Sequence, residues 1–127
     1  MAAAVERVVI VVWMAGPERP VQAAAPFVYA LAARALDLEV ELHFTSTAVK
    51  WLFEGVAETA FTDAARTRTV ADYMREAHAA GILLYACGMA LAEHRHGEAL
   101  RVECTGVAGA AAAIVASVHP GSRALVF

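Results

Sequence analysis

The chain has 127 residues, of which 60% are hydrophobic and 18% are charged, and its formal net charge is −3. This length predicts a single domain over residues 1–127, and the apolar content excludes a disordered chain, because enough surface can be buried to offset the entropy lost on ordering. Ten basic residues against thirteen acidic ones, without a basic cluster, leave little charge for a phosphate backbone, so we expect no nucleic-acid partner.

The apolar runs and the N-terminal residues bear on where the protein acts. Residues 8–15 fall well short of the roughly 20 residues that cross a bilayer, and residues 107–118 are mostly Ala and Gly. Residues 1–7 have no basic region ahead of an apolar core, so they do not resemble a secretory signal. We therefore expect a cytoplasmic protein that does not cross a membrane, with its two cysteines as thiols.

Short β-branched runs alternate with longer alanine-rich segments from the start of the chain. Residues 8–13 form a continuous β-branched run, which is typical of a strand covered on both faces. Residues 19–37 predict a helix, and residues 39–44 alternate with period two, which predicts a second strand. A short helix is then expected to begin near Ser46 and to end near Gly55.

The middle of the chain predicts a helix, a strand and a second short helix. Thr69 and Asp72 have the spacing of a capping box, with Asp in place of the usual Glu, and the helix they begin is expected to end near Gly81. Residues 82–87 then predict a third buried strand, and residues 89–94 predict the short helix.

The C-terminal part continues the same alternation. Residues 100–104 predict a fourth strand, residues 106–118 an alanine-rich helix, and residues 123–127 a last strand. Strands that alternate with helices in this way predict an α/β domain with a mainly parallel sheet and helices on both of its faces.

Both cysteines end a predicted strand, at the edge where parallel sheets bind ligands. Cys87 also precedes a predicted helix, whose N-terminal N–H groups favour the nucleophilic thiolate. A buried structural cysteine is the alternative interpretation for Cys87 and the preferred one for Cys104, since free cysteines are commonly buried. The two are too far apart in sequence for a CxxC motif, but neighbouring strands would allow a redox pair.

Three histidines are candidate site residues. His94 and His96 flank an arginine just after the short helix, and their spacing matches no zinc pattern, so a solvated turn is preferred and no metal is expected. His94 follows Cys87 by seven residues, about two helical turns, which makes it a weaker candidate to tune that thiol. His43, inside the second strand, is interpreted as a core or interface histidine. Without a glycine-rich phosphate-binding motif, no cofactor is expected either.

Residues 79–91, AAGILLYACGMAL, resemble the strand and cysteine segment of the DsrE/DsrF-like family. Residues 44–46 and 52–56 resemble the second strand and following helix of that family, and residues 106–127 resemble its last helix and strand. The resemblance implies a three-layer α/β/α sandwich with a five-stranded parallel sheet, assembled into trimers or hexamers.

The family includes sulfur-relay proteins that carry a persulfide on one cysteine, and Cys87 is the residue that maps onto that position. The resemblance therefore implies sulfur handling through a persulfide on Cys87, with sulfur donor and acceptor proteins as partners. Two alternatives stay open. One is a non-enzymatic oligomeric module that binds a small ligand or metal through His43, Cys87 and His94. The other is thiol–disulfide chemistry between Cys87 and Cys104.

The apolar fraction is high for a domain of this size. Alanine accounts for part of it, and a sheet covered on both faces accounts for the Val, Ile and Leu runs. These two explanations do not cover Trp51, Phe53 and the apolar segment after Cys87. We expect these residues to form an interface between subunits of a homo-oligomer.

Overall fold

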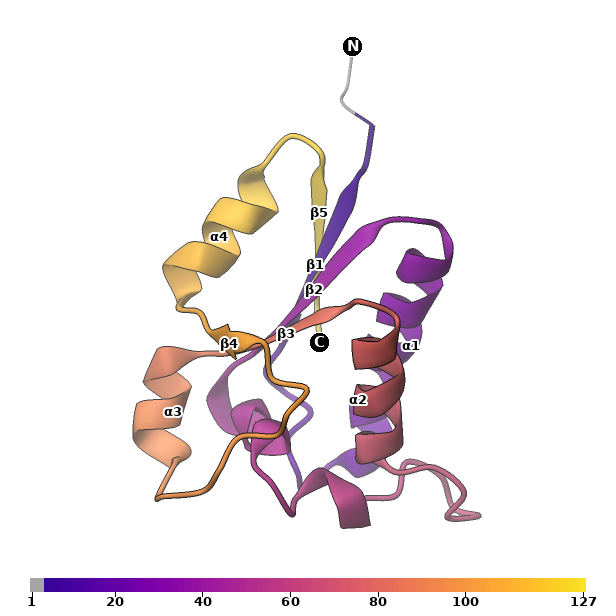
Figure 1. Cartoon of the computed structure of the whole chain (residues 1–127), viewed down its shortest axis with the longest axis vertical. Coiled ribbons are helices and arrows are strands. Elements are labelled where there is room, and N and C mark those ends of the chain that lie inside the picture. Colours follow the sequence, from indigo (N-terminus) through magenta and orange to yellow (C-terminus); the bar gives the residue numbers. More distant parts are fainter. Residues whose placement is uncertain (1–3) are drawn as a thin grey trace.

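Five parallel strands form one sheet in a computed structural model that describes residues 4–127, with the order β4-β3-β2-β1-β5 (Figure 1). The first three residues of the N-terminal segment considered above lie outside the described residues. The strands are β1 (Arg7–Val12), β2 (Glu39–Phe44), β3 (Leu83–Ala86), β4 (Gly106–Val107) and β5 (Ser122–Val126). The predicted α/β class with a parallel sheet is confirmed.

Helices lie on both faces of this sheet, as the alternating pattern predicts (Figure 1). On one face, α1 (Pro20–Ala35) and α2 (Val70–Ala79) pack against each other and against the strands. On the other face, α4 (Ala110–Val118) packs against β1 and β5. No helix among residues 4–127 is both long and apolar enough to span a bilayer.

Shorter helical segments lie at the carboxyl end of the strands. After β2, the chain forms two 3-10 helices, η1 (Ser46–Leu52) and η2 (Ala57–Thr59). After β3, it forms α3 (Gly88–His94), which contacts η1. These connections begin where β2 and β3 end, and they fix the surroundings of Cys87.

The expectation that Trp51 and Phe53 lie at a subunit interface is wrong. Both side chains are buried in the core, together with Phe27, Phe44 and Met74. The tight turn of η1 directs Trp51 inward, where its indole N–H donates a hydrogen bond to the Ala15 carbonyl at 2.6 Å. A satisfied indole N–H removes the polar cost of burying this ring, so the core accepts it.

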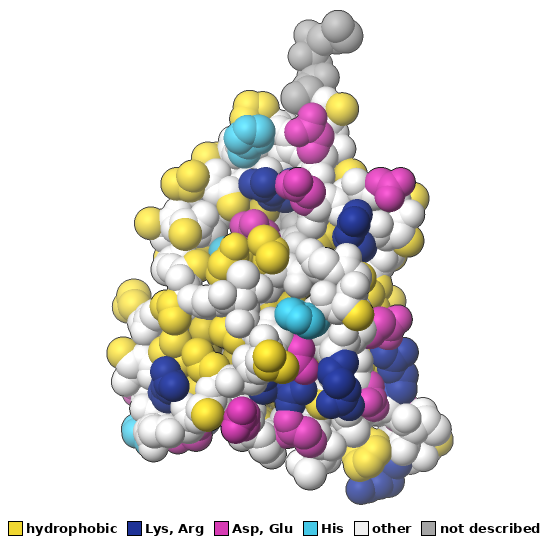
Figure 2. Space-filling model, viewed as in Figure 1, with side chains coloured by type: hydrophobic (Ala, Val, Ile, Leu, Met, Phe, Trp, Pro, Cys, Tyr) yellow, Lys and Arg dark blue, Asp and Glu magenta, His cyan; other side chains and the backbone are white. Residues whose placement is uncertain are grey.

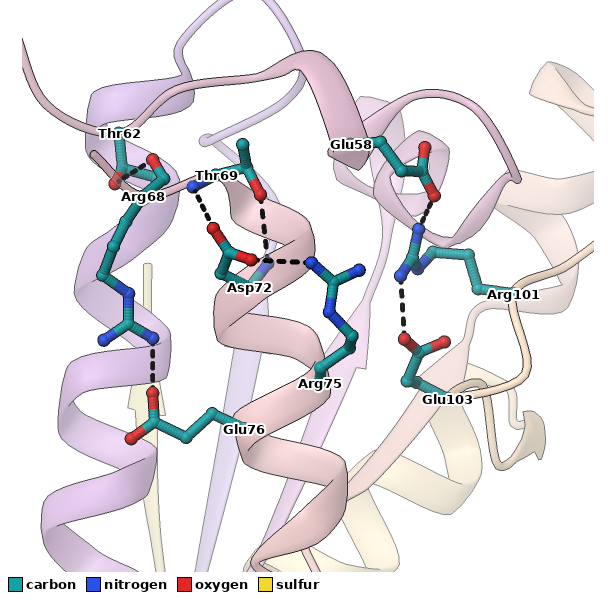
Figure 3. Close-up of polar contacts among 9 residues, drawn as sticks. All are labelled: Glu58, Thr62, Arg68, Thr69, Asp72, Arg75, Glu76, Arg101 and Glu103. Atoms are coloured by element: carbon teal, nitrogen blue, oxygen red, sulfur yellow. Dashed lines mark hydrogen bonds and ion pairs between the residues drawn. The ribbon is translucent and has the colours of Figure 1, made fainter. Parts of the chain in front are cut away.

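The strand predicted over residues 100–104 does not form. The side chain of Arg101 is buried and pairs with Glu58 and with Glu103, the latter at 2.8 Å (Figure 3). Val102, between them, is 86% exposed, so the charged groups are inside and the apolar one is outside. The reason is long-range, because Glu58 from η2 supplies a counter-charge that the local pattern does not show. Pairing with β3 is confined to the two residues of β4.

The predicted capping box at the start of α2 is confirmed (Figure 3). The Thr69 hydroxyl accepts a hydrogen bond from the Asp72 N–H at 3.1 Å, and the Asp72 carboxylate accepts one from the Thr69 N–H at 2.8 Å. Arg75 pairs with the same carboxylate at 2.6 Å. The Thr69 N–H and the Arg75 guanidinium hold the pKa of Asp72 below its usual value.

Replacing Thr69 with Ala leaves the N–H of Asp72 without its acceptor. We expect Thr69→Ala to lower the free energy of unfolding by about 1 kcal/mol, measured by urea denaturation at neutral pH. Thr59→Ala is the matched control, because Thr59 is exposed and its hydroxyl makes no hydrogen bond among residues 4–127. Equal losses in the two variants would show that the capping box does not stabilise α2.

Candidate functional site

Cys87 is the residue that links β3 to α3, and strand pairing fixes its position. The register sets Phe44 opposite Ala86, and the Cys87 N–H donates to the Phe44 carbonyl at 2.9 Å. Cys87 therefore lies beside Thr45, the first residue after β2. It is also the N-cap of α3, with an extended backbone that turns the chain from strand to helix.

Polar groups near the sulfur outweigh the effect of burial on the pKa of the Cys87 thiol. Burial by itself raises the pKa, because it penalises the charged thiolate. The Thr45 hydroxyl and the backbone N–H groups of Ala90 and Met89 lie near the sulfur, where they favour the thiolate and lower the pKa further than burial raises it. The net pKa lies below the ordinary cysteine value, so the thiolate is favoured in the folded protein.

A cavity of about 190 Å³ opens in front of this sulfur. Its floor comes from the ends of three neighbouring strands, with Val11, His43, Thr45 and Cys87. Its opposite wall comes from residues 108–117, which include most of α4, and is largely apolar. Cys87 is therefore accessible to a small reactant while Thr45 supports it from the strand side.

The α4 wall is a part of the site that the sequence pattern does not predict. The chain leaves β4 at one edge of the sheet and returns to β5 at the other, so α4 must cross a sheet face. Combined with the right-handed rule for parallel crossovers, that strand order would have placed the start of α4 beside Cys87. The strand order is the missing signal, because the residues alone do not reveal it.

His43 lies in the same cavity and is paired with Glu41. The two side chains are 7% and 12% exposed, and the His43 Nε2 atom lies 2.9 Å from a carboxylate oxygen of Glu41. The imidazole also stacks on the Tyr85 ring of β3, with 5.2 Å between the ring centroids. Alternation along β2 places Glu41, His43 and Thr45 on one face, directed toward α4 rather than toward α1 and α2.

The structure does not bring Cys104 into this cavity. Cys104 lies in the turn before β4, and its thiol contacts the Gly106 carbonyl at 3.6 Å. Burial raises the pKa of the Cys104 thiol, and N–H groups of Gly106 and Ala86 offset this only in part. Both cysteines are free thiols. The two therefore differ in chemistry, with the thiolate favoured at Cys87 and the neutral thiol at Cys104.

His94 is the last residue of α3, whereas Cys87 immediately precedes the helix. Seven helical residues span about 10 Å, so His94 and Cys87 lie at opposite ends of α3. His96 follows in an exposed turn, where its N–H bonds to Glu98. Within residues 4–127, no three His, Cys, Asp or Glu side chains are grouped to hold a metal ion.

The sequence matches the model of the DsrE/DsrF-like family over residues 7–127. The chain belongs to this family. Its structure is similar to that of the ychN protein from E. coli, with a TM-score of 0.74 and 13% identity over 97% of this chain and 99% of that one. It is also similar to MTH1491 from Methanobacterium thermoautotrophicum, a protein of unknown function, with a TM-score of 0.67 and 20% identity over 95% and 98% of the two chains.

At these identities the two structures show the shared fold, and the α/β sandwich implied by the resemblance is confirmed. No curated protein sequence matches the chain significantly.

Removing the Thr45 hydroxyl tests whether hydrogen bonding activates Cys87. We expect Thr45→Val to raise the pKa of Cys87 toward the ordinary cysteine value, because a hydroxyl that favours the thiolate is lost. The measurement is the rate of alkylation by iodoacetamide against pH, followed at Cys87 by peptide mass spectrometry. The variant should react more slowly near pH 7 and should approach the parent rate at alkaline pH, where both thiols are ionised.

Ser117→Ala is the control for this series, because Ser117 lines the cavity but its hydroxyl donates to the Ala113 carbonyl at 2.7 Å. It should leave the alkylation profile unchanged. An unchanged profile in Thr45→Val would show that this hydroxyl does not stabilise the thiolate.

Proposed function

We propose that this DsrE/DsrF-like protein accepts sulfane sulfur on Cys87 and passes it on as a persulfide. The observation that carries the proposal is the contrast between the two thiols, of which only the one that lines the cavity has a lowered pKa. A sulfur carrier needs a nucleophilic thiolate that is reachable and, once loaded, shielded from solvent. Cys87 meets these needs through the Thr45 hydroxyl, the N–H groups at the start of α3 and the apolar wall of α4.

The reaction requires no oxidant. The Cys87 thiolate attacks the outer sulfur of a donor persulfide, R–S–SH. A sulfur–sulfur bond forms at Cys87 as the donor sulfur–sulfur bond breaks, and the electron pair leaves with the thiolate R–S⁻. Attack by an acceptor thiolate on the outer sulfur of the Cys87 persulfide is the same reaction in the other direction and regenerates Cys87.

The proposal includes donor and acceptor proteins as partners and a cytoplasmic location, where the cell keeps thiols reduced. Thiol–disulfide chemistry between the two cysteines gains no support, because Cys104 lies outside the cavity and its neutral thiol is favoured.

Loading the purified protein tests the proposal. After incubation with a low-molecular-weight persulfide and removal of excess donor, we expect an added mass of one sulfur atom on the Cys87 peptide. Transfer to an acceptor thiol should remove it. Cys104→Ser should load normally and Cys87→Ser should not. The proposal is contradicted if Cys87 stays unmodified at neutral pH, and stoichiometric zinc lost in Cys87→Ser would support a metal-binding module instead.

We also propose that copies of the chain associate through α4. This helix has no ionisable residue, and its apolar side chains project into solvent: Ile114, Val115 and Val118 are all exposed. Hydrophobic side chains gather over α4 at the upper left of Figure 2. The neighbouring edge strand β5 adds exposed Val126. An exposed apolar helix beside exposed Val126 gains more from packing against a second copy of the same surface than from contact with water.

Light scattering with size-exclusion chromatography tests this association. We expect a mass well above the 13.4 kDa of the single chain, and a shift toward that value in Val115→Glu. Val21→Glu is the control, since Val21 is 65% exposed on α1, across the sheet from α4. A monomer in the parent protein, or equal dissociation in both variants, would show that α4 is not the interface.

A further inference from the structure

We propose that His43, oriented by Glu41, is the proton-transfer residue of the Cys87 site, an inference that rests on the persulfide function proposed above. His43 takes the proton from the Cys87 thiol and returns it to the sulfur that leaves. The juxtaposition that carries this is a buried imidazole–carboxylate pair in the wall of the cavity that holds the thiol.

The hydrogen bond to Glu41 sets which nitrogen of His43 is available. A buried carboxylate accepts, so the Nε2 atom, 2.9 Å from it, donates and carries a proton. In the neutral ring, Nδ1 then has the free lone pair, and among residues 4–127 it has no hydrogen-bond partner. Stacking on Tyr85 limits rotation of the ring. The ring is thus held in one orientation, with the lone pair of Nδ1 free to accept a proton.

Packing alone does not account for this pair. The face of the sheet that carries it is covered by α4, whose side chains carry no charge and, apart from Ser117, are apolar in this region. Two apolar residues would fill such a place at no cost in desolvation, whereas a buried pair repays its desolvation only with good geometry. The other ionisable groups that face the pair are the Tyr85 phenol, Arg7 near the amino end of the strands, and Cys87.

Protons and electrons balance over one cycle. Neutral His43 accepts the proton of the Cys87 thiol at Nδ1, giving a thiolate and an imidazolium. The thiolate attacks the outer sulfur of R–S–SH, and the electron pair of the broken bond leaves on R–S⁻. The imidazolium donates its proton to R–S⁻, which departs as R–SH. Cys87 then carries –S–SH, and His43 is again neutral.

A proton donor matters most for a leaving sulfur that is strongly basic. Thiolates of acidic aromatic thiols leave readily without a proton, whereas alkyl thiolates leave slowly. Two disulfides therefore probe the same attack by Cys87, namely dithiobis(nitrobenzoate), which releases an acidic aromatic thiol, and hydroxyethyl disulfide, which releases an alkyl thiol. Loss of the proton donor should slow the reaction with hydroxyethyl disulfide far more than the reaction with dithiobis(nitrobenzoate). General damage to the site should slow both reactions alike.

The experiment measures both rates near pH 7 in Cys104→Ala protein, with and without His43→Gln, whose amide can still donate to Glu41. We expect the alkyl reaction to fall about 100-fold and the aromatic reaction to fall less than about tenfold. His96→Gln is the control, because His96 is exposed and lies outside the cavity, and it should leave both rates unchanged. Equal slowing of the two reactions, or none, would overturn the role of His43.

The double variant Glu41→Leu/His43→Leu keeps the test decisive if His43→Gln does not fold, because removing both partners leaves no buried group unsatisfied. It should show the same selective loss. Loading with a persulfide separates the two proposals. If the parent protein loads but its variants show no selective loss of the alkyl reaction, only the His43 inference is contradicted. If the parent protein does not load, the sulfur-carrier function itself is contradicted.

Discussion

The parallel register between β2 and β3 sets Phe44 opposite Ala86, so the two strands end side by side and their next residues meet. The backbone bond from Cys87 to the Phe44 carbonyl then holds the thiol next to Thr45, whose hydroxyl favours the thiolate. One strand position earlier, the same register places the His43 ring against Tyr85. A slip of one residue would turn these side chains to the opposite face, so the chemistry of the site depends on this pairing.

The second constraint is the return of the chain from β4 to β5 across the sheet. Because these strands lie at opposite edges, α4 has to cross the face that carries Glu41 and His43, and its start closes the cavity in front of Cys87. Its composition suits that place, since small alanines allow close approach to the strands. The same composition leaves its outer side apolar and exposed, which links the geometry of the site to the association proposed for the protein.

Elements that depend on local patterns could be predicted from the sequence, whereas features that depend on distant partners could not. The alternation over residues 39–44 gives the bounds of β2, and the Thr69 and Asp72 spacing gives the start of α2. The position of Cys87 at a strand end before a helix was likewise predictable. The strand expected at residues 100–104 does not form, and Arg101 in that segment is buried and pairs with Glu58 of η2, a distant partner that the local pattern does not show. His43 was placed on a strand, but its pairing with Glu41 and the α4 wall require the assembled sheet.

The central claim is that the folded protein lowers the pKa of Cys87, in a cavity that a small sulfur compound can enter. The most direct measurement is an ultraviolet titration of thiolate absorbance in Cys104→Ala protein, which leaves Cys87 as the single thiol. The account predicts a midpoint clearly below the value of about 8.5 for an unperturbed cysteine, returning toward that value when the protein is unfolded in urea. A midpoint at or above about 8.5 in the folded protein would contradict it.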